Sequence, residues 1–323
     1  MTNNETTTEN QHEMNPSGFD ETPQIVSDDT PLNVTIDWAE RKKQRDKRVK
    51  NAREKVEALI EPPGEKVTID DLQLEVPKPG ETVVVLQRNA KDNRDPSSEL
   101  EIGTLIPEAA EHVKVQTKES LDNILSSLSS EERKKIDFLV VAANTKLDTP
   151  LGEEIKSEHK RAVETAVQVL AGIKKSMNEF ELSDSQLLNK TDEPIELSSG
   201  RMNDLHMLKD SPEFVEFLKN KYGTGHEFWK AYEDDSERKT REAMGAEGPD
   251  DIAKRVGEYM GVLANAMEQY HKQHPDRRVI VWVESHYDAI SPFIKHAAGM
   301  DNTDYLSVDN GAGVVVKLGK VEK

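Results

Sequence analysis

Four short apolar runs, separated by longer stretches with helical spacing, constrain the fold of this 323-residue chain more than any other feature. Val, Ile and Leu fill these runs almost continuously instead of alternating with polar residues. Strands of this kind are buried on both faces, so helices must cover both sides of their sheet. We therefore predict the α/β class, as a three-layer α/β/α sandwich with a mostly parallel sheet. The predicted strands are residues 82–86, 138–143, 279–283 and 314–318.

Helical spacing of apolar residues fills the stretches between the predicted strands. It predicts helices over residues 120–135 and 154–175, where apolar side chains recur mostly every three or four positions. A third helix is predicted to begin at Pro249, since proline fits the first turn of a helix, and its apolar stripe extends to Tyr270.

The composition divides the chain into a tail, a helical extension and one folded domain. Residues 1–33 are rich in Thr, Asn, Glu, Asp and Pro. They carry too few large apolar groups to offset the entropy cost of ordering, so we predict a disordered acidic tail. Residues 34–79 are predicted to contain a basic amphipathic helix, over 37–60, and a linker. The folded domain is predicted to span 80–323, with a helical insert at about 192–247.

Composition also excludes several kinds of chemistry and partner. The chain has no cysteine, which removes disulfides, thiolate metal sites and cysteine nucleophiles and suits a reducing cytoplasm. Its formal charge of -19 argues against binding of the folded body to nucleic acid, which requires a basic face. No apolar run approaches the roughly 20 residues of a membrane helix, and no secretory signal opens the chain. We therefore expect a cytoplasmic protein without membrane contact, and the spacing of His and acidic residues predicts no metal or other cofactor.

One strongly basic stretch, residues 41–53, stands out in this acidic sequence. One interpretation is a site for RNA or for an acidic partner. The other is a solvated helix face that docks on the acidic body of the same protein. We favour the second, because no aromatic residues alternate with the charges to stack on bases, and Trp38 is isolated. Residues 41–53 remain a candidate contact for a protein partner.

Polar residues directly follow two of the predicted strands. Arg88 and Asn89 come after the first strand, and His286 comes after the third. Because ligands of open α/β sheets bind at the carboxyl ends of strands, we expect these side chains to meet there. A guanidinium can hold two oxygens of a phosphate, although an arginine at such a place also pairs with carboxylates. His286 precedes a predicted helix start, whose positive end attracts an anion, but a histidine there is also a common structural hydrogen-bonding residue.

A third segment, Arg161-Ala162-Val163-Glu164-Thr165-Ala166, lies between these two in the sequence. With Arg88-Asn89-Ala90 before it and Ser285-His286 after it, the chain resembles the histidine phosphatase superfamily, also called phosphoglycerate mutase-like, over residues 80–323. In that superfamily the first strand ends in Arg-His-Gly, and the second phosphate-binding arginine lies in an Arg-Ala-x-x-Thr-Ala pattern. The resemblance implies that Arg88, Arg161 and His286 bind the phosphate of a phosphorylated small molecule, or a phosphate anion.

Asn89 occupies the position at which members of the superfamily carry the nucleophilic histidine. An imidazole nitrogen attacks phosphorus there, whereas the lone pair of a carboxamide nitrogen is delocalised into its carbonyl and does not attack. The resemblance therefore implies a phosphatase-like protein whose phosphohistidine-dependent hydrolysis is lost or much reduced, with phosphate binding retained. Natural degeneration and deliberate replacement both explain the asparagine. We favour degeneration, since Gln87 and Ala90 also depart from the family pattern.

Members of the superfamily also use an acid, usually glutamate, to protonate the leaving oxygen. Glu193 and Glu196 lie in the expected region and Asp288 closely follows His286, although each also fits a solvated surface carboxylate. Two other functions stay open on the sequence. One is an active phosphomonoester hydrolase in which His286 or an acidic neighbour activates water, without a covalent intermediate. The other is a regulatory or scaffolding protein that binds partners through the basic N-terminal helix.

Overall fold

By its internal contacts the chain divides into two units, Met1–Asp37 and Trp38–Lys323, and every described residue belongs to the second. The predicted tail, residues 1–33, and the basic stretch 41–53 lie outside the described residues. The computed structural model describes residues 56–57, 66–68, 72–95, 97–146, 148–149, 155–156, 159–197, 200–202, 211–223, 226–301 and 306–318.

The centre of the second unit is a mixed, mostly parallel β-sheet. Five of its strands follow the order β10 (Gly313–Leu318), β3 (Thr82–Arg88), β8 (Arg278–Ser285), β4 (Ile136–Ala143) and β7 (Ile195–Leu197). The last four pair in parallel with one another, whereas β10 is antiparallel to β3. The prediction of an α/β protein with a mostly parallel sheet is therefore confirmed.

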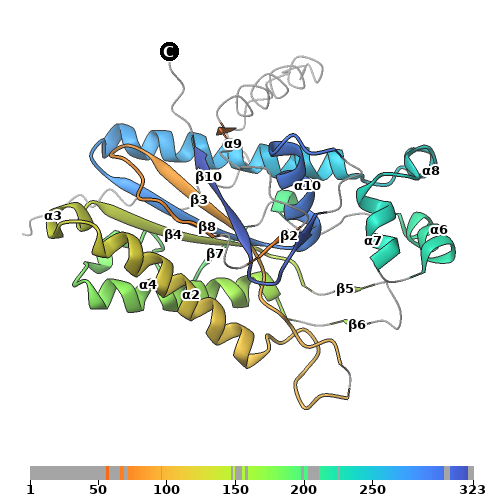
Figure 1. The fold of residues 1–323 in the computed structure, drawn as a ribbon, viewed down its shortest axis with the longest axis horizontal. Coiled ribbons are helices and arrows are strands. Elements are labelled where there is room, and N and C mark those ends of the chain that lie inside the picture. The colour runs from red at the N-terminus through yellow and green to blue at the C-terminus, as the bar shows by residue number, and fades with distance from the viewer. Residues whose placement is uncertain are drawn as a thin grey trace, which may run out of the picture. The chain divides into compact units, whose positions relative to one another are not determined.

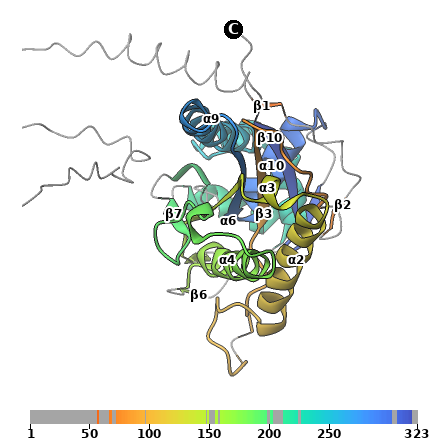
Figure 2. The same cartoon turned by 90° about the vertical axis from the view of Figure 1, so that its left-hand side faces the viewer.

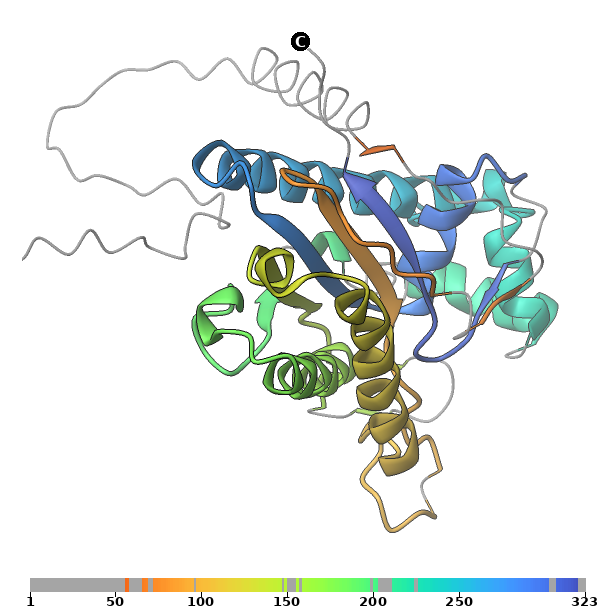
Figure 3. The same cartoon turned by 60° about the vertical axis from the view of Figure 1, so that its left-hand side comes forward.

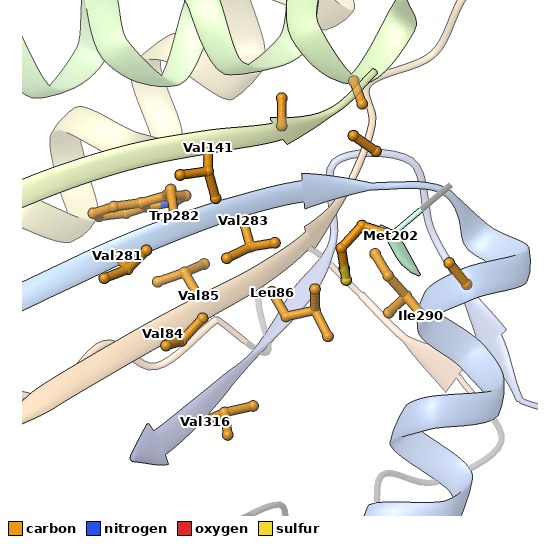
Figure 4. Packing of buried hydrophobic residues seen from close by; sticks show 14 of the residues in the cluster. Val84, Val85, Leu86, Val141, Met202, Val281, Trp282, Val283, Ile290 and Val316 are labelled. Atoms are coloured by element: carbon orange, nitrogen blue, oxygen red, sulfur yellow. The ribbon is translucent and has the colours of Figure 1, made fainter. Parts of the chain in front are cut away.

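Burial on both faces explains why these strands are so apolar. All eight residues of β4 are buried, and so are seven of the eight residues of β8. Trp282 of β8 is fully buried and lies in register between Val85 of β3 and Val140 of β4. Figure 4 shows its ring among the valines of the neighbouring strands. Because such side chains contribute stability only when they leave water, the sheet carries the main hydrophobic core.

Helices cover both faces of the sheet, so each apolar strand face has a packing partner (Figures 1 and 2). On one face, α4 (Arg161–Glu179) packs on β4 and β8 and against α2 (Pro107–Ser126). On the other, α9 (Pro249–Gln273) packs against α10 (Tyr287–Ala297), and the predicted start of α9 at its proline is confirmed. Figure 3 shows β3 and β10 between α9 and α2. Among the described residues, no helix is both long and apolar enough to span a bilayer.

The prediction of a helix over residues 37–60 is wrong for the part of this range that the structure describes. Strand β1 (Val56–Glu57) pairs antiparallel with β10 as a sixth, edge strand of the sheet. The spacing of apolar residues favoured a helix, but the free backbone N–H and C=O groups of an edge strand provide partners for an extended segment. The remainder of the expected helix lies outside the described residues.

The helix expected over residues 154–175 begins and ends later than predicted. Its counterpart α4 starts at Arg161, because the preceding strand β6 (Ile155–Lys156) pairs antiparallel with β5 (Asp148–Thr149). Strand pairing overrides the helical spacing of these residues. The later start places Arg161 in the first turn of the helix.

The helix expected over residues 120–135 is divided in two. α2 already begins at a proline upstream of the predicted start, and it ends at Ser126. Ser129 then caps a short helix, α3 (Ser130–Arg133), by accepting a hydrogen bond from the backbone N–H of Glu132, whose carboxylate accepts one in return. This reciprocal capping is a start signal that the spacing of apolar residues does not contain.

The insert expected at about 192–247 is not helical throughout the residues that the structure describes. Its beginning supplies β7 of the main sheet and a short 3-10 helix at Gly200–Met202. Helices α6 (Pro212–Tyr222), α7 (His226–Glu233) and α8 (Arg238–Ala243) follow. The other short elements are β2 (Lys66–Val67), which pairs in parallel with β9 (Ser307–Val308), and a 3-10 helix at Asp184–Gln186.

Gly172 marks a very close approach of α4 to α2. A Cβ atom added at this position would lie 2.6 Å from the backbone oxygen of Lys114 and 2.9 Å from the Cβ of Thr117. In a helix interior, glycine to alanine normally stabilises by about 1 kcal/mol. Here the steric clash outweighs that gain, because the obstacle includes backbone and one helix must move. We expect Gly172→Ala to lower the free energy of unfolding, measured by urea denaturation, by about 2 kcal/mol.

Gly257 in α9 provides the matched control for this substitution. A Cβ atom added there would meet its nearest neighbour, the Phe293 ring, at 4.0 Å. Gly257→Ala should therefore stabilise the protein through helix propensity alone. Equal effects of the two substitutions would contradict the steric explanation.

Candidate functional site

The polar ends of β3 and β8 lie side by side. Arg88 is the last residue of β3 and is in register with Ser285, the last residue of β8. The backbone N–H of Asn89 donates a hydrogen bond of 2.8 Å to the carbonyl of Ser285, which extends the parallel ladder by one residue. Asn89 and His286 therefore leave the sheet at the same edge, where ligands of such sheets bind.

The side chains of Asn89 and His286 meet in the interior. Asn89 is 1% exposed and His286 is 2% exposed, and Asn89 Oδ1 lies 3.2 Å from His286 Nδ1. Because Asn89 Nδ2 donates to the carbonyl of Ala90 at 2.8 Å, Asn89 Oδ1 is the acceptor toward the imidazole. This assigns the proton of the neutral ring to Nδ1. His286 Nε2 then carries a lone pair, and it has no hydrogen-bond partner among the described residues.

Positive charge surrounds this imidazole. The pKa of His286 lies well below its usual range, first because burial penalises the charged ring, and then because Arg161 and Arg88 repel a further positive charge. Two guanidinium groups from distant segments of the chain therefore act on one histidine. Arg88 and Arg161, two of the residues that the sequence singled out for phosphate binding, thus both act through their charge on the third, His286.

Arg88 is held by α10 and by the segment around β9. Its Nη1 donates a hydrogen bond to the carbonyl of Val308, and its guanidinium carbon lies 5.1 Å from the centre of the Tyr287 ring. Burial is the main cause that lowers the pKa of Arg88, while Tyr287 and Asp288 raise it. In the described part of the chain no ion pair joins Arg88 to a carboxylate, and its Nε has no hydrogen-bond partner.

Arg161 opens α4, and Thr165 ties this first turn to the end of β3. Thr165 Oγ1 accepts a hydrogen bond from the backbone N–H of Ala90 at 3.0 Å and donates one to the carbonyl of Arg161 at 2.8 Å. Ala162 and Ala166 are fully buried, so their small side chains let the helix approach the sheet. The Arg-Ala-x-x-Thr-Ala pattern therefore docks the start of this helix beside the end of β3.

Sequence reasoning missed Asp92, a carboxylate neighbour of Arg161. Arg161 Nη1 lies 3.7 Å from Asp92 Oδ1, and Arg94 Nε lies 2.5 Å from Asp92 Oδ2. Because two arginines share this one carboxylate, it offsets only part of the positive charge of Arg161. Arg161 Nε has no hydrogen-bond partner within the described residues. The alternation of acidic and basic residues just after β3 was the available signal.

The three acidic candidates lie in different surroundings. The carboxylate of Glu196, on β7, lies 2.6 Å from Lys160 Nζ, at the start of α4. Glu193 is exposed before β7, and in the described part it makes no ion pair or hydrogen bond with the two site arginines or the site histidine. Asp288 lies in the first turn of α10, and its charge raises the pKa of Arg88. Asp288 and Glu196 are thus connected to the site or its border, and Glu193 is not.

A cavity of about 330 Å³ opens beside the end of β3. Asn310 lines this cavity and donates a hydrogen bond from Nδ2 to the carbonyl of Asn89 at 3.3 Å. The other lining residues are Lys91, His112, Asp309 and small aliphatic side chains. Arg88, Arg161 and His286 do not line this cavity, which lies beside the end of β3 and not over the three residues.

Neither a protein-family model nor a curated protein matches this sequence. In the part of the chain that the structure describes, no group of three or more His, Asp or Glu side chains is arranged to bind a metal ion. The chemistry of the site itself is therefore the basis for a function.

Proposed function

We propose that this protein binds a phosphomonoester or a phosphate anion through Arg88, Arg161 and His286. The proposal includes the finer fold, a three-layer sandwich of the phosphoglycerate mutase-like kind, within the histidine phosphatase superfamily. The parallel centre of the sheet supports it, with an arginine at the end of β3 and a histidine after β8. The docked Arg-Ala-x-x-Thr-Ala helix start between them in the sequence is further support.

Three buried nitrogen atoms without partners carry this proposal. Arg88 Nε, Arg161 Nε and His286 Nε2 lack a hydrogen-bond partner among the described residues. Leaving a buried polar group unpaired costs about 1 to 3 kcal/mol, and more for a charged group. The mutual repulsion of the two guanidinium groups, through which Arg161 lowers the pKa of Arg88, is a second cost. A tetrahedral dianion offsets both costs, because its oxygens accept hydrogen bonds from the two guanidinium N–H groups and its charge neutralises them. It satisfies His286 Nε2 only when this nitrogen takes up a proton, which the charge of the dianion favours.

Catalysis through a phosphohistidine is lost or much reduced in this proposal. The carboxamide of Asn89 is engaged with His286 and with the carbonyl of Ala90. It is not a nucleophile near neutral pH, so bound phosphomonoester stays intact or is cleaved slowly by water. We therefore propose a pseudoenzyme of the phosphatase class, in the reducing cytoplasm that a chain without cysteine suits.

Removing one of the two arginines is expected to weaken anion binding strongly. Arg161→Ala should raise the dissociation constant for inorganic phosphate about a hundredfold, because a charge-assisted contact in a buried site is lost. Titration calorimetry of the full chain measures this constant. Comparison of two buffers should also show proton uptake by the unaltered protein, because an anion raises the pKa of His286.

Arg238→Ala is the matched control for the loss of one positive charge. Arg238 is exposed and lies 2.8 Å from the carboxylate of Glu242, in α8. This variant should bind phosphate as the unaltered protein does. Equal phosphate affinities of the Arg161→Ala and Arg238→Ala proteins would overturn the proposal.

Hydrolysis by a non-covalent route is the second candidate, and the unpartnered Nε2 of His286 favours it. A neutral imidazole with a free lone pair can accept a proton from a water molecule that attacks phosphorus. Its lowered pKa makes it a weak base, so turnover should be slow. Release of phosphate from an aryl phosphate, abolished in His286→Ala, would support this route, and absence of any release would exclude it.

A further inference from the structure

A single buried carboxylate organises one face of α10. Glu233, at the end of α7, is 3% exposed. Tyr287 donates a hydrogen bond to its Oε1, Ser291 donates one of 3.4 Å to Oε2, and Lys295 Nζ lies 3.8 Å from Oε2. Residues four positions apart lie on the same face of a helix. Three successive turns of α10 are therefore directed at one side chain from the insert.

This network reaches the site through Tyr287. The guanidinium of Arg88 lies over the Tyr287 ring, 5.1 Å from its centre. The Tyr287 hydroxyl contacts Glu233 and also the carbonyl of Leu306 at 3.1 Å, while Arg88 donates to the carbonyl of Val308. The ring and the guanidinium are therefore anchored to the same short segment, and the contact with Glu233 helps to fix the ring.

The surroundings of Glu233 argue for a geometric role. Glu233 and Lys295 are 3% and 2% exposed, and a buried ion pair adds little stability compared with well-packed apolar residues. The causes that most shift the pKa of Arg88 include Tyr287 but not Glu233. The contacts that link Glu233 to Arg88 run through the tyrosine, whose hydroxyl donates to Glu233 and whose ring lies under the guanidinium.

We infer that Glu233 is a positioning residue for anion binding, which holds the guanidinium of Arg88 in place through Tyr287. The inference rests on the proposed anion site and deepens it. It gives the insert a function in that site, because α7 supplies the carboxylate that fixes the aromatic ring beneath a phosphate-binding arginine.

Sulfate is a suitable probe, because it is a tetrahedral dianion whose charge does not change near neutral pH. Glu233→Gln and Tyr287→Phe should each raise the dissociation constant of the full-length protein for sulfate about three- to tenfold. The double variant should lose no more affinity than either single variant, because both substitutions break the same contact. Additive losses would overturn the inference, since they would mean that Glu233 acts independently of Tyr287.

Glu237→Gln and Tyr222→Phe are matched controls from the same insert. Tyr222 donates a hydrogen bond of 2.6 Å to Glu237, and Lys221 pairs with that carboxylate, so the contact has the same chemistry. In the described part of the chain, neither control residue contacts Arg88. Both controls should bind sulfate as the unaltered protein does. If Glu233→Gln fails to fold, Tyr287→Phe decides the outcome, because it keeps the carboxylate and its lysine.

The NMR signal of the Arg88 Nε–H group reports on the same guanidinium without any anion. Assigned by its loss in Arg88→Lys, it should broaden in Glu233→Gln and Tyr287→Phe and stay sharp in the controls. If the unaltered protein binds no sulfate, the proposed function fails. The NMR signal alone then tests the positioning role of Glu233, and an unchanged signal in Glu233→Gln and Tyr287→Phe overturns that role. If Glu233→Gln binds sulfate as the unaltered protein does and the signal is unchanged, the anion site stands and the positioning role is wrong.

Discussion

Replacing Asn89 with histidine is expected to produce phosphatase turnover. Release of phosphate from an aryl phosphate should rise about a hundredfold or more over the unaltered protein, because an imidazole is a nucleophile and a carboxamide is not. Burial and the positive charges of Arg161 and Arg88 keep the neighbouring His286 neutral. The same surroundings should keep an imidazole at position 89 unprotonated and able to attack phosphorus. An acid-labile phosphorylated intermediate should then be trapped on this variant.

Two further variants separate the nucleophile from the binding site. Asn89→Ala removes the carboxamide without adding a nucleophile, and it should gain no turnover. Combining Asn89→His with Arg161→Ala should abolish the gain, because the phosphate is no longer held. If Asn89→His turns over no faster than Asn89→Ala, more than the nucleophile is missing, and only the binding part of the proposed function stands.

Replacing Glu284 with glutamine is expected to stabilise the fold, increasingly so as the pH rises. Glu284 lies in β8, in register between Gln87 and Ala142, and is 0% exposed. Neither of its carboxylate oxygens has a hydrogen-bond partner among the described residues. Burial therefore raises the pKa of Glu284 well above its usual range.

The sign of the pH dependence follows from this raised pKa. The folded protein keeps the proton of Glu284 at pH values at which the unfolded chain has already released it. The contribution of Glu284 to stability is thus fully present below the ordinary pKa of 4.5. It falls by about 1.4 kcal/mol per pH unit as the pH rises from there towards the folded pKa. The glutamine of the Glu284→Gln protein cannot ionise. At pH 8 the free energy of unfolding of this variant should therefore exceed that of the unaltered protein by more than about 1.4 kcal/mol.

Urea denaturation of both proteins at a series of pH values measures this difference. Burial also raises the pKa of Glu233, to about 7, but this group is present in both proteins and its effect cancels. Glu216→Gln is the matched control, since Glu216 is exposed on α6, and it should show no pH-dependent gain. A Glu284→Gln protein that is less stable than the unaltered one at pH 8 would mean that the carboxylate has a partner in solution.

Local patterns were enough to predict the central sheet and the sheet edge that Arg88 and His286 share. β3, β4 and β8 each appeared as a continuous apolar run, because a strand buried on both faces accommodates few polar residues. Arg88 and His286 follow two of these runs, and parallel pairing alone brings them to one edge. Local spacing failed where it competed with pairing, since Val56–Glu57 and Ile155–Lys156 are strands despite their helical spacing.

No local sequence pattern predicted the contacts between distant segments of the chain. Nothing in the sequence joined Glu233 to Tyr287 or Asp92 to Arg161, and nothing marked Glu284 as a buried carboxylate without a partner. Each of these features depends on which elements pack together. They are also the features on which the positioning role and the pH dependence of stability rest.

The sequence by itself determined which segments are apolar on both faces and which polar residues end them, and hence an α/β protein with a polar sheet edge. These features can be read from single residues, because burial of a strand on both faces favours an apolar side chain at each of its positions. Only the tertiary structure decided which charges meet and which stay unpaired. Side chains far apart in the chain become neighbours only when whole helices and strands pack against one another.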